Sequence, residues 1–218
     1  MHTRTMKKVI PLALAALMST TALTAASAAE ADFKAKSAGD IVIRARGIYV
    51  TPSESSSLSF AGGDVNVGND TVPEVDFSYF LTDNVALELI AATTRHSVDG
   101  AGTLAGTSLG KVSLLPPTLT VQYHFMPKQR FSPYVGAGLN YTFFYNVDSG
   151  AVPSVHYDNH IGYALQAGAD YAISGPWSLN VDVKKIFLRT NVSVAGGAIT
   201  GKVDLDPWIF GLGVGYRF

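Results

Sequence analysis

The chain has no cysteine in its 218 residues, and only 15% of its residues are charged. Without cysteine, neither a disulfide framework nor a thiolate metal site can form, although this absence does not fix the cellular compartment. The charged fraction lies well below the quarter or so that is usual for soluble domains. A formal net charge of −1 gives no indication of a nucleic-acid partner.

Long apolar runs are also missing after residue 29. A membrane-spanning helix needs about 18 or more continuous apolar residues, and no later stretch reaches that length. If the mature protein lies in a membrane, it must therefore cross with strands. Strands can do so only as a closed barrel, because lipid cannot satisfy the polar groups of an open sheet edge.

The N-terminal stretch has the three-part pattern of a secretory signal peptide. Basic residues in "MHTRTMKK" precede the apolar "VIPLALAALMSTTALTA", and "ASAAE" offers small residues for cleavage after Ala28 or Ala29. The alternative is a membrane-anchoring helix, which Pro11 and the Ser/Thr-rich second half disfavour. We therefore expect a signal peptide over residues 1–29 and one mature domain over residues 30–218.

Period-two alternation of apolar and polar residues is the strongest signal in the mature chain. It recurs in eight segments, which are 40–50, 72–81, 84–93, 115–125, 131–145, 160–173, 176–188 and 206–218. Short turns at 82–84, 126–130 and 174–176 alternate with long polar stretches at about 51–71, 96–111, 146–159 and 190–203, as in bacterial outer-membrane barrels. The pattern predicts an all-β protein, an eight-stranded antiparallel up-and-down transmembrane barrel.

A soluble β-sandwich would also show alternating strands. Its second face would be the surface and would carry many lysines and glutamates. In this chain the second face holds glycine, serine, threonine and a few charges of both signs. A crowded barrel interior fits that composition better.

Five stretches together resemble the OmpW family of eight-stranded outer-membrane proteins. They are "GDIVIRARGIYVTP", "NVALELIAAT", "LPPTLTVQYHF", "FSPYVGAGLNYTFF" and "DPWIFGLGVGYRF". The resemblance implies a bacterial outer-membrane location and a narrow, mainly hydrophobic passage for small apolar molecules, with alkane-uptake relatives. Tyr216 and Phe218 in the closing "YRF" resemble the signal that the outer-membrane assembly machinery reads. The expected partners are that machinery, membrane lipid, lipopolysaccharide and small hydrophobic solutes.

Charged residues of both signs fall on the inward parity of the strands. The expected set is Arg44, Arg46, Asp76, Glu88, Asp182 and Lys184, with Asp170 and Arg217 as further candidates. Buried charges of this kind should pair, because an unpaired charge in a dry lumen is strongly unfavourable. We favour a salt-bridged plug over an ion pathway, because balanced charges fill space without giving ion selectivity.

Apolar residues fall on the inward parity farther along the strands, toward the long loops. The expected apolar pocket comprises Ile48, Ile90, Phe144, Ile186 and Leu188 on that parity, together with Leu58 and Phe60 in or beside the outer loops. Such a pocket, sealed below by the charges, could release a solute only sideways. Pro116 and Pro117 mark the candidate lateral portal, because proline cannot donate to a β ladder. The alternative is that the strand begins after Pro117 and the prolines only shape the rim.

Other chemistry is disfavoured. His96 and Ser97 are adjacent on a strand and so point to opposite faces, which prevents a nucleophile–base pair. His124, His156 and His160 lack metal-ligand spacing on one face. We therefore expect no catalytic residues, no metal and no cofactor.

The alternative function is a structural or receptor role, such as phage or bacteriocin docking without transport. Lys185 alone breaks the alternation of the strands, since it is a charged residue with the outward parity of the apolar residues.

Overall fold

The computed structural model describes residues 33–53, 55–58, 63–102, 105–106, 108–148, 150, 155–194 and 199–218. The expected signal peptide at 1–29 lies outside these residues. The strands are β1 (Ile41–Thr51), β2 (Ser55–Leu58), β3 (Gly63–Val67), β4 (Asp70–Phe80), β5 (Val85–Ala92), β6 (Thr94–Gly102), β7 (Ser108–Leu115), β8 (Thr118–His124), β9 (Phe131–Asp148), β10 (Val155–Tyr157), β11 (His160–Ser174), β12 (Trp177–Phe187), β13 (Arg189–Val194), β14 (Ile199–Asp204) and β15 (Trp208–Arg217).

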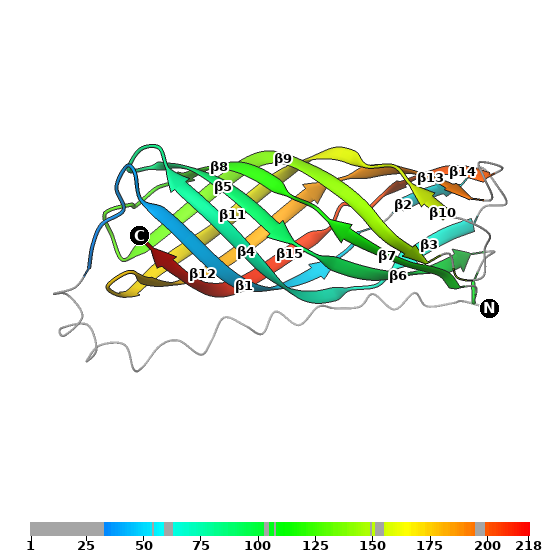
Figure 1. The fold of residues 1–218 in the computed structure, drawn as a ribbon, viewed down its shortest axis with the longest axis horizontal. Coiled ribbons are helices and arrows are strands. Elements are labelled where there is room, and N and C mark those ends of the chain that lie inside the picture. Colours follow the sequence, from blue (N-terminus) through cyan, green and yellow to red (C-terminus); the bar gives the residue numbers. More distant parts are fainter. Residues whose placement is uncertain are drawn as a thin grey trace, which may run out of the picture.

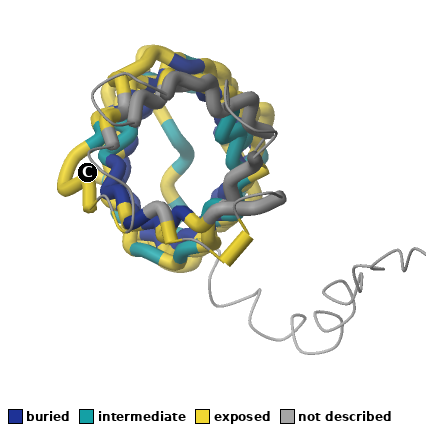
Figure 2. The backbone as a smooth tube through the Cα atoms, turned by 90° about the vertical axis from the view of Figure 1, so that its right-hand side faces the viewer, coloured by how far each residue is buried: buried dark blue, intermediate teal, exposed yellow. Residues whose placement is uncertain are grey.

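Eight of these strands close into a barrel. Their order is β11–β12–β15–β1–β4–β5–β8–β9, and the pairing of β9 with β11 completes the ring. All the pairings are antiparallel. Figure 2 shows the closed ring along the barrel axis, and Figure 1 shows the barrel from the side. The predicted eight-stranded barrel is therefore confirmed.

The expected long loops at 96–111 and 190–203 are largely strands, and that part of the prediction is wrong. β6 pairs with β7, and β13 pairs with β14, so that both hairpins prolong the barrel wall at the end opposite the chain's C-terminus (Figure 1). β6 buries Thr94, His96 and Val98 and exposes polar residues between them. This outer face lacks the apolar alternation of the membrane segments, because water rather than lipid surrounds it.

Side chains alternate between a buried inner face and an exposed apolar outer face. In β8, for example, Thr118, Thr120 and Gln122 are buried while Leu119, Val121 and Tyr123 are about half exposed. Large exposed apolar residues continue around the ring, including Leu139, Tyr163 and Leu212. Hydrocarbon is the solvent that suits such a belt. No helix of the described residues is long and apolar enough to span a membrane.

The inner face of β15 is nearly bare because a neighbouring strand lies very close to it. A Cβ atom on Gly213 would lie 2.1 Å from the backbone oxygen of Ala45 and 2.7 Å from Cα of Arg46. On β11, a Cβ atom on Gly168 would lie 2.5 Å from the phenol of Tyr134. These glycines therefore leave the room that the large inward side chains require.

Candidate functional site

Two arginines of β1 organise the lower lumen, the half nearest the short turns. Strand register sets Arg44 opposite Asp76 and Arg46 opposite Glu74 on β4. Arg44 Nη1 donates to Asp76 Oδ1 at 2.9 Å, and Arg46 Nε donates to Glu74 Oε1 at 2.8 Å. Arg44 also binds both carboxylate oxygens of Asp170 on β11. The Arg44 guanidinium thus joins β1 to β4 on one side and to β11 on the other side of the ring.

The other expected charges lie in the same network. Arg46 Nη2 donates to Glu88 Oε1 at 3.2 Å. Lys184 Nζ lies 2.8 Å from Glu74 Oε1 and 3.2 Å from Asp182 Oδ1. All six of the expected plug residues are at most 3% exposed. The structure therefore brings them together, and every charge among them has a partner of opposite sign.

The sequence analysis missed Glu74 and Tyr134. Glu74 is 3% exposed and accepts from both Arg46 and Lys184. Tyr134 is 1% exposed, and its hydroxyl donates to Asp182 Oδ2 at 2.8 Å. Glu74 has the same parity as Asp76, so its position was readable from the sequence. Tyr134 has inward parity on β9 and could have been found in the same way.

Lys36, which precedes β1, reaches the lower end of the lumen. Its ammonium donates to Asp170 Oδ2 at 2.7 Å and to Ser132 Oγ at 3.0 Å. It also lies 3.0 Å from Nδ1 of His124. Burial lowers the pKa of Lys36 from its usual value, against the opposing effect of the Asp170 carboxylate. No periodic pattern marks this residue in the sequence, because it lies outside a strand.

Aromatic rings complete the closure at this end. The His124 ring lies 4.9 Å from the ring centroids of both Phe80 and Tyr134, and all three residues are at most 1% exposed.

The ion pairs described above join four cations to five carboxylates in the lower lumen. The cations are Lys36, Arg44, Arg46 and Lys184, and the carboxylates are Glu74, Asp76, Glu88, Asp170 and Asp182.

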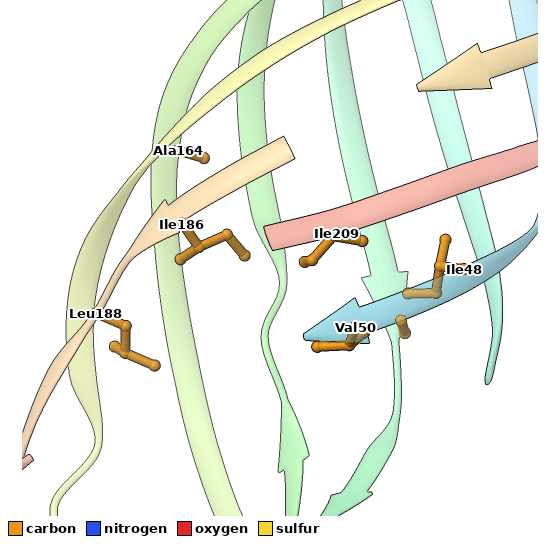
Figure 3. Packing of buried hydrophobic residues seen from close by; sticks show 7 residues of the cluster. Ile48, Val50, Ala164, Ile186, Leu188 and Ile209 are labelled. Carbon is orange, nitrogen blue, oxygen red and sulfur yellow. The ribbon is translucent and has the colours of Figure 1, made fainter. Parts of the chain in front are cut away.

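An apolar cluster lines the upper lumen, the half toward the long hairpins. Its buried members are Ile48, Val50, Ala92, Ala164, Ile186, Leu188 and Ile209, with Val72, Phe144 and Leu205 packed against them. Figure 3 shows these side chains converging from β1, β11, β12 and β15 and from the residue after β12. Of the expected pocket residues, Ile48, Ile186 and Leu188 belong to the cluster and Phe144 borders it.

The other expected pocket residues differ in position. Ile90 is buried on β5 at 3% exposure but is not a member of that cluster. Leu58 ends β2, in the small sheet above the barrel. Phe60 lies outside the described residues. Among the described residues, the barrel strands and the residue after β12 supply most of the buried apolar side chains of the upper lumen.

The wall is interrupted beside this cluster, at the two prolines. β5 pairs with β8 as far as Ile90 opposite Thr118, and pairing resumes between β6 and β7 at Thr94 opposite Leu114. Within these described strands, no ladder pair joins residues 91–93 to residues 115–117. Three residues of strand span about 10 Å. We call this interruption the breach.

Lumenal side chains satisfy the edge of the breach. The Pro117 carbonyl accepts from the backbone N–H of Tyr141 on β9. Carbonyls alternate in direction along a strand, so that of Pro116 would face the missing partner across the breach. It accepts instead from Asn140 Nδ2 at 3.2 Å and Thr118 Oγ1 at 3.0 Å. The Pro116 carbonyl oxygen is therefore hydrogen-bonded although its ladder partner across the breach is missing.

Lys185 points outward, as its parity predicts. Its ammonium donates to the backbone carbonyl of Asp206 and lies 5.1 Å from the Trp208 ring centroid. Asp206 and its neighbours form the break between β14 and β15. A carbonyl and an aromatic ring thus stabilise the one charge on the outward face of the described barrel strands.

The remaining expected positions are readily placed. His96 is buried, with Nδ1 2.8 Å from the Gly68 carbonyl oxygen, whereas Ser97 is exposed on the opposite face. The described residues contain no group of three or more histidines, aspartates or glutamates arranged to hold a metal. Tyr216 and Phe218 form an edge-to-face pair at 4.7 Å beside Trp177, near the short turns.

Comparison with known proteins agrees with this architecture. The model of the OmpW family matches residues 37–218. The outer-membrane protein y4mB of Sinorhizobium fredii is 46% identical over 181 residues, which cover 81% of this chain and 79% of y4mB. The dibenzothiophene metabolism operon protein PahQ of Pseudomonas aeruginosa is 33% identical over 162 residues, covering 72% of this chain and 76% of PahQ.

Solved structures show the same barrel. The crystal structure of the outer membrane protein OprG from Pseudomonas aeruginosa superposes with a TM-score of 0.81 at 32% identity, covering 86% of this chain and 99% of OprG. The family match spans nearly all of the described barrel. The chain therefore belongs to the OmpW family and is an outer-membrane β-barrel protein.

Proposed function

We propose that the protein is a passive passage for small apolar molecules, which enter the upper lumen from outside and leave sideways into the outer leaflet. The observation that carries this proposal is the position of the breach. Ala92 belongs both to the apolar cluster and to the unpaired stretch 91–93. An apolar solute held by the cluster would therefore meet the opening in the wall directly.

The lower lumen supports a sideways exit. The Arg44, Arg46 and Lys184 network occupies the interior with fully buried ion pairs. An apolar solute cannot pass there without breaking pairs in a medium of low dielectric, at a cost of about 3–5 kcal/mol for each charge left unpaired. Release through the breach into hydrocarbon has no such barrier. The lower network thus acts as the plug of this proposal.

The solute class follows from the lining. Isoleucine, valine and leucine side chains dominate the cluster and offer no hydrogen bonds to a solute. Such a lining favours hydrocarbon-like molecules over polar ones. A relative whose name refers to dibenzothiophene metabolism, PahQ, is consistent with an apolar aromatic solute. The role requires neither catalysis nor a cofactor.

Three partners belong to the same proposal. The exposed Phe218 and the adjacent Tyr216, at the end of the last strand, would be read by the outer-membrane assembly machinery. Lipopolysaccharide and membrane lipid would surround the exposed apolar belt. Pro116 and Pro117 would form the lateral portal.

The portal is tested by changing both prolines to valine. The double variant Pro116→Val/Pro117→Val regains two backbone N–H donors, of which that of residue 116 faces β5 and can extend the ladder across the breach. We expect slower entry of diphenylhexatriene, an apolar dye that fluoresces in hydrocarbon, into intact cells that produce the protein. Pro133→Val, at the start of β9 and away from the breach, is the matched control. Unchanged dye entry in the double variant would contradict the portal.

A receptor role is the second candidate. The β6–β7 and β13–β14 hairpins rise beyond the apolar belt and would present a surface to phage or bacteriocins. This role requires no passage. A wild-type protein that gives no dye entry above that of cells lacking it would favour the receptor role.

A further inference from the structure

We propose that Ala92 sets the size limit of the lateral passage. This inference rests on the proposed function, because a size limit has meaning only if solutes leave through the breach. It names one residue on β5 as the determinant of which apolar solutes pass.

Ala92 is the small member of the cluster on the breach side. Its buried neighbours in the cluster are mostly isoleucine, valine and leucine. The other alanine, Ala164, lies on β11, where Gly138 and Ile186 pair with it on both sides. An alanine beside a continuous wall gives width only to the lumen, whereas an alanine beside an interrupted wall gives width to the exit.

The side chain of Ala92 faces the right direction for this role. Inward residues alternate along the strand, and Ile90 and Thr94 on either side of Ala92 are both buried. Its backbone is held from one side only, opposite Glu74 on β4. Toward β7 and β8 it has no ladder partner among the described strands. Its methyl group therefore borders the stretch of wall that lacks ladder pairs between the lumen and lipid.

The opposite edge of the breach is fixed. Asn140 and Thr118 hold the Pro116 carbonyl from inside, and both are at most 2% exposed. Thr142 Oγ1 donates in turn to Asn140 Oδ1 at 2.7 Å. With one edge held by hydrogen bonds, the volume of the side chain at position 92 determines the free width.

The test compares two apolar dyes of different width in intact cells, the narrow rod diphenylhexatriene and the four-ring pyrene. For Ala92→Leu we expect entry of pyrene to fall about tenfold or more relative to diphenylhexatriene, the scale of one or two methylene groups in a hydrophobic site. Ala92→Gly should change the ratio in the opposite direction. A ratio that stays the same in both variants would overturn the inference.

Two controls make the outcome specific. Ala137→Leu makes the same change on the lipid face of β9, where the residue is exposed and paired on both sides, and should leave the ratio unchanged. Ala164→Leu fills the lumen away from the breach and should slow both dyes alike. If Ala164→Leu shifts the ratio as much as Ala92→Leu, the limit lies in the lumen and the inference is wrong.

Failure of the inference is distinguishable from failure of the proposed function. Wild-type cells that take up neither dye faster than cells lacking the protein would contradict the function itself. Wild-type cells that take up both dyes, with a ratio insensitive to residue 92, would contradict only the role of Ala92. Retention of the compact, heat-sensitive mobility of a folded barrel on gels confirms that each variant has assembled.

Discussion

Arg44 binds Asp170 through two hydrogen bonds across the lumen, from Nε to Oδ1 at 3.0 Å and from Nη2 to Oδ2 at 2.8 Å. The two residues lie 126 positions apart in the chain, on strands that are not neighbours in the ring. Such paired, nearly parallel bonds fix the planar guanidinium more firmly than a single bond does. This pair therefore ties opposite walls of the barrel together.

Asp170→Asn should weaken the barrel strongly. The amide carries no charge, so Arg44 and Lys36 both lose a buried ionic partner. We expect the free energy of unfolding to fall by about 3–5 kcal/mol, the usual result when one partner of a buried pair is removed. Urea titration in lipid bilayers, followed by tryptophan fluorescence, measures the change.

The control for this variant is Asp83→Asn. Asp83 lies in the turn between β4 and β5 and pairs with Lys128 at 3.7 Å, with both side chains well exposed. An exposed pair contributes about 0–1 kcal/mol, so this variant should unfold close to wild type. Equal effects of Asp83→Asn and Asp170→Asn would show that the lumen network does not hold the barrel together.

Gly213→Ala should prevent correct closure between β15 and β1. A methyl group there would lie 2.1 Å from the Ala45 carbonyl oxygen, which is part of a neighbouring strand and cannot rotate away. We expect most of the refolded protein to lack the compact mobility of a closed barrel on gels. Gly47→Ala is the matched control, because a Cβ there meets no atom within 4 Å. Normal folding of Gly213→Ala would mean that the two strands can separate without cost.

The sequence predicted the barrel because lipid imposes a strict rule. Each membrane strand must alternate, and β8 does so over its whole length. The same parity placed Arg44 and Lys184 in the lumen. It did not place Lys36, which reaches the network from a segment without periodicity.

The alternation that lipid imposes on membrane strands predicts neither the hairpins nor the breach. β6 is a strand surrounded by water, so its outer face carries no apolar signal that could mark it. The two prolines indicated an interruption, but only strand register shows that it spans residues 91–93 on the facing strand. Which apolar residues lie beside the breach depends on the order of the strands around the ring, and this order joins residues far apart in the sequence.

Asn140→Leu should show whether the position of the Pro116 carbonyl at the edge of the breach depends on the hydrogen bonds from Asn140 and Thr118. The variant removes the amide that donates to the Pro116 carbonyl at 3.2 Å and to Thr118 Oγ1 at 2.9 Å. The Pro116 carbonyl keeps the Thr118 hydroxyl as a donor, so the variant loses the two hydrogen bonds of the amide. Each contributes about 0.5–1.5 kcal/mol, and the free energy of unfolding should therefore fall by about 1–3 kcal/mol. Urea titration in bilayers measures it.

Thr142→Val is the matched comparison for Asn140→Leu. It removes only the hydroxyl that donates to Asn140 Oδ1 and leaves the Asn140 amide in place beside Pro116. Its effect should therefore be smaller, about 0.5–1.5 kcal/mol. Because the Pro116 carbonyl in Asn140→Leu can turn toward the N–H groups of residues 91–93, entry of diphenylhexatriene should also slow in that variant and not in Thr142→Val. Equal dye entry in both would mean that the breach stays open without the Asn140 amide.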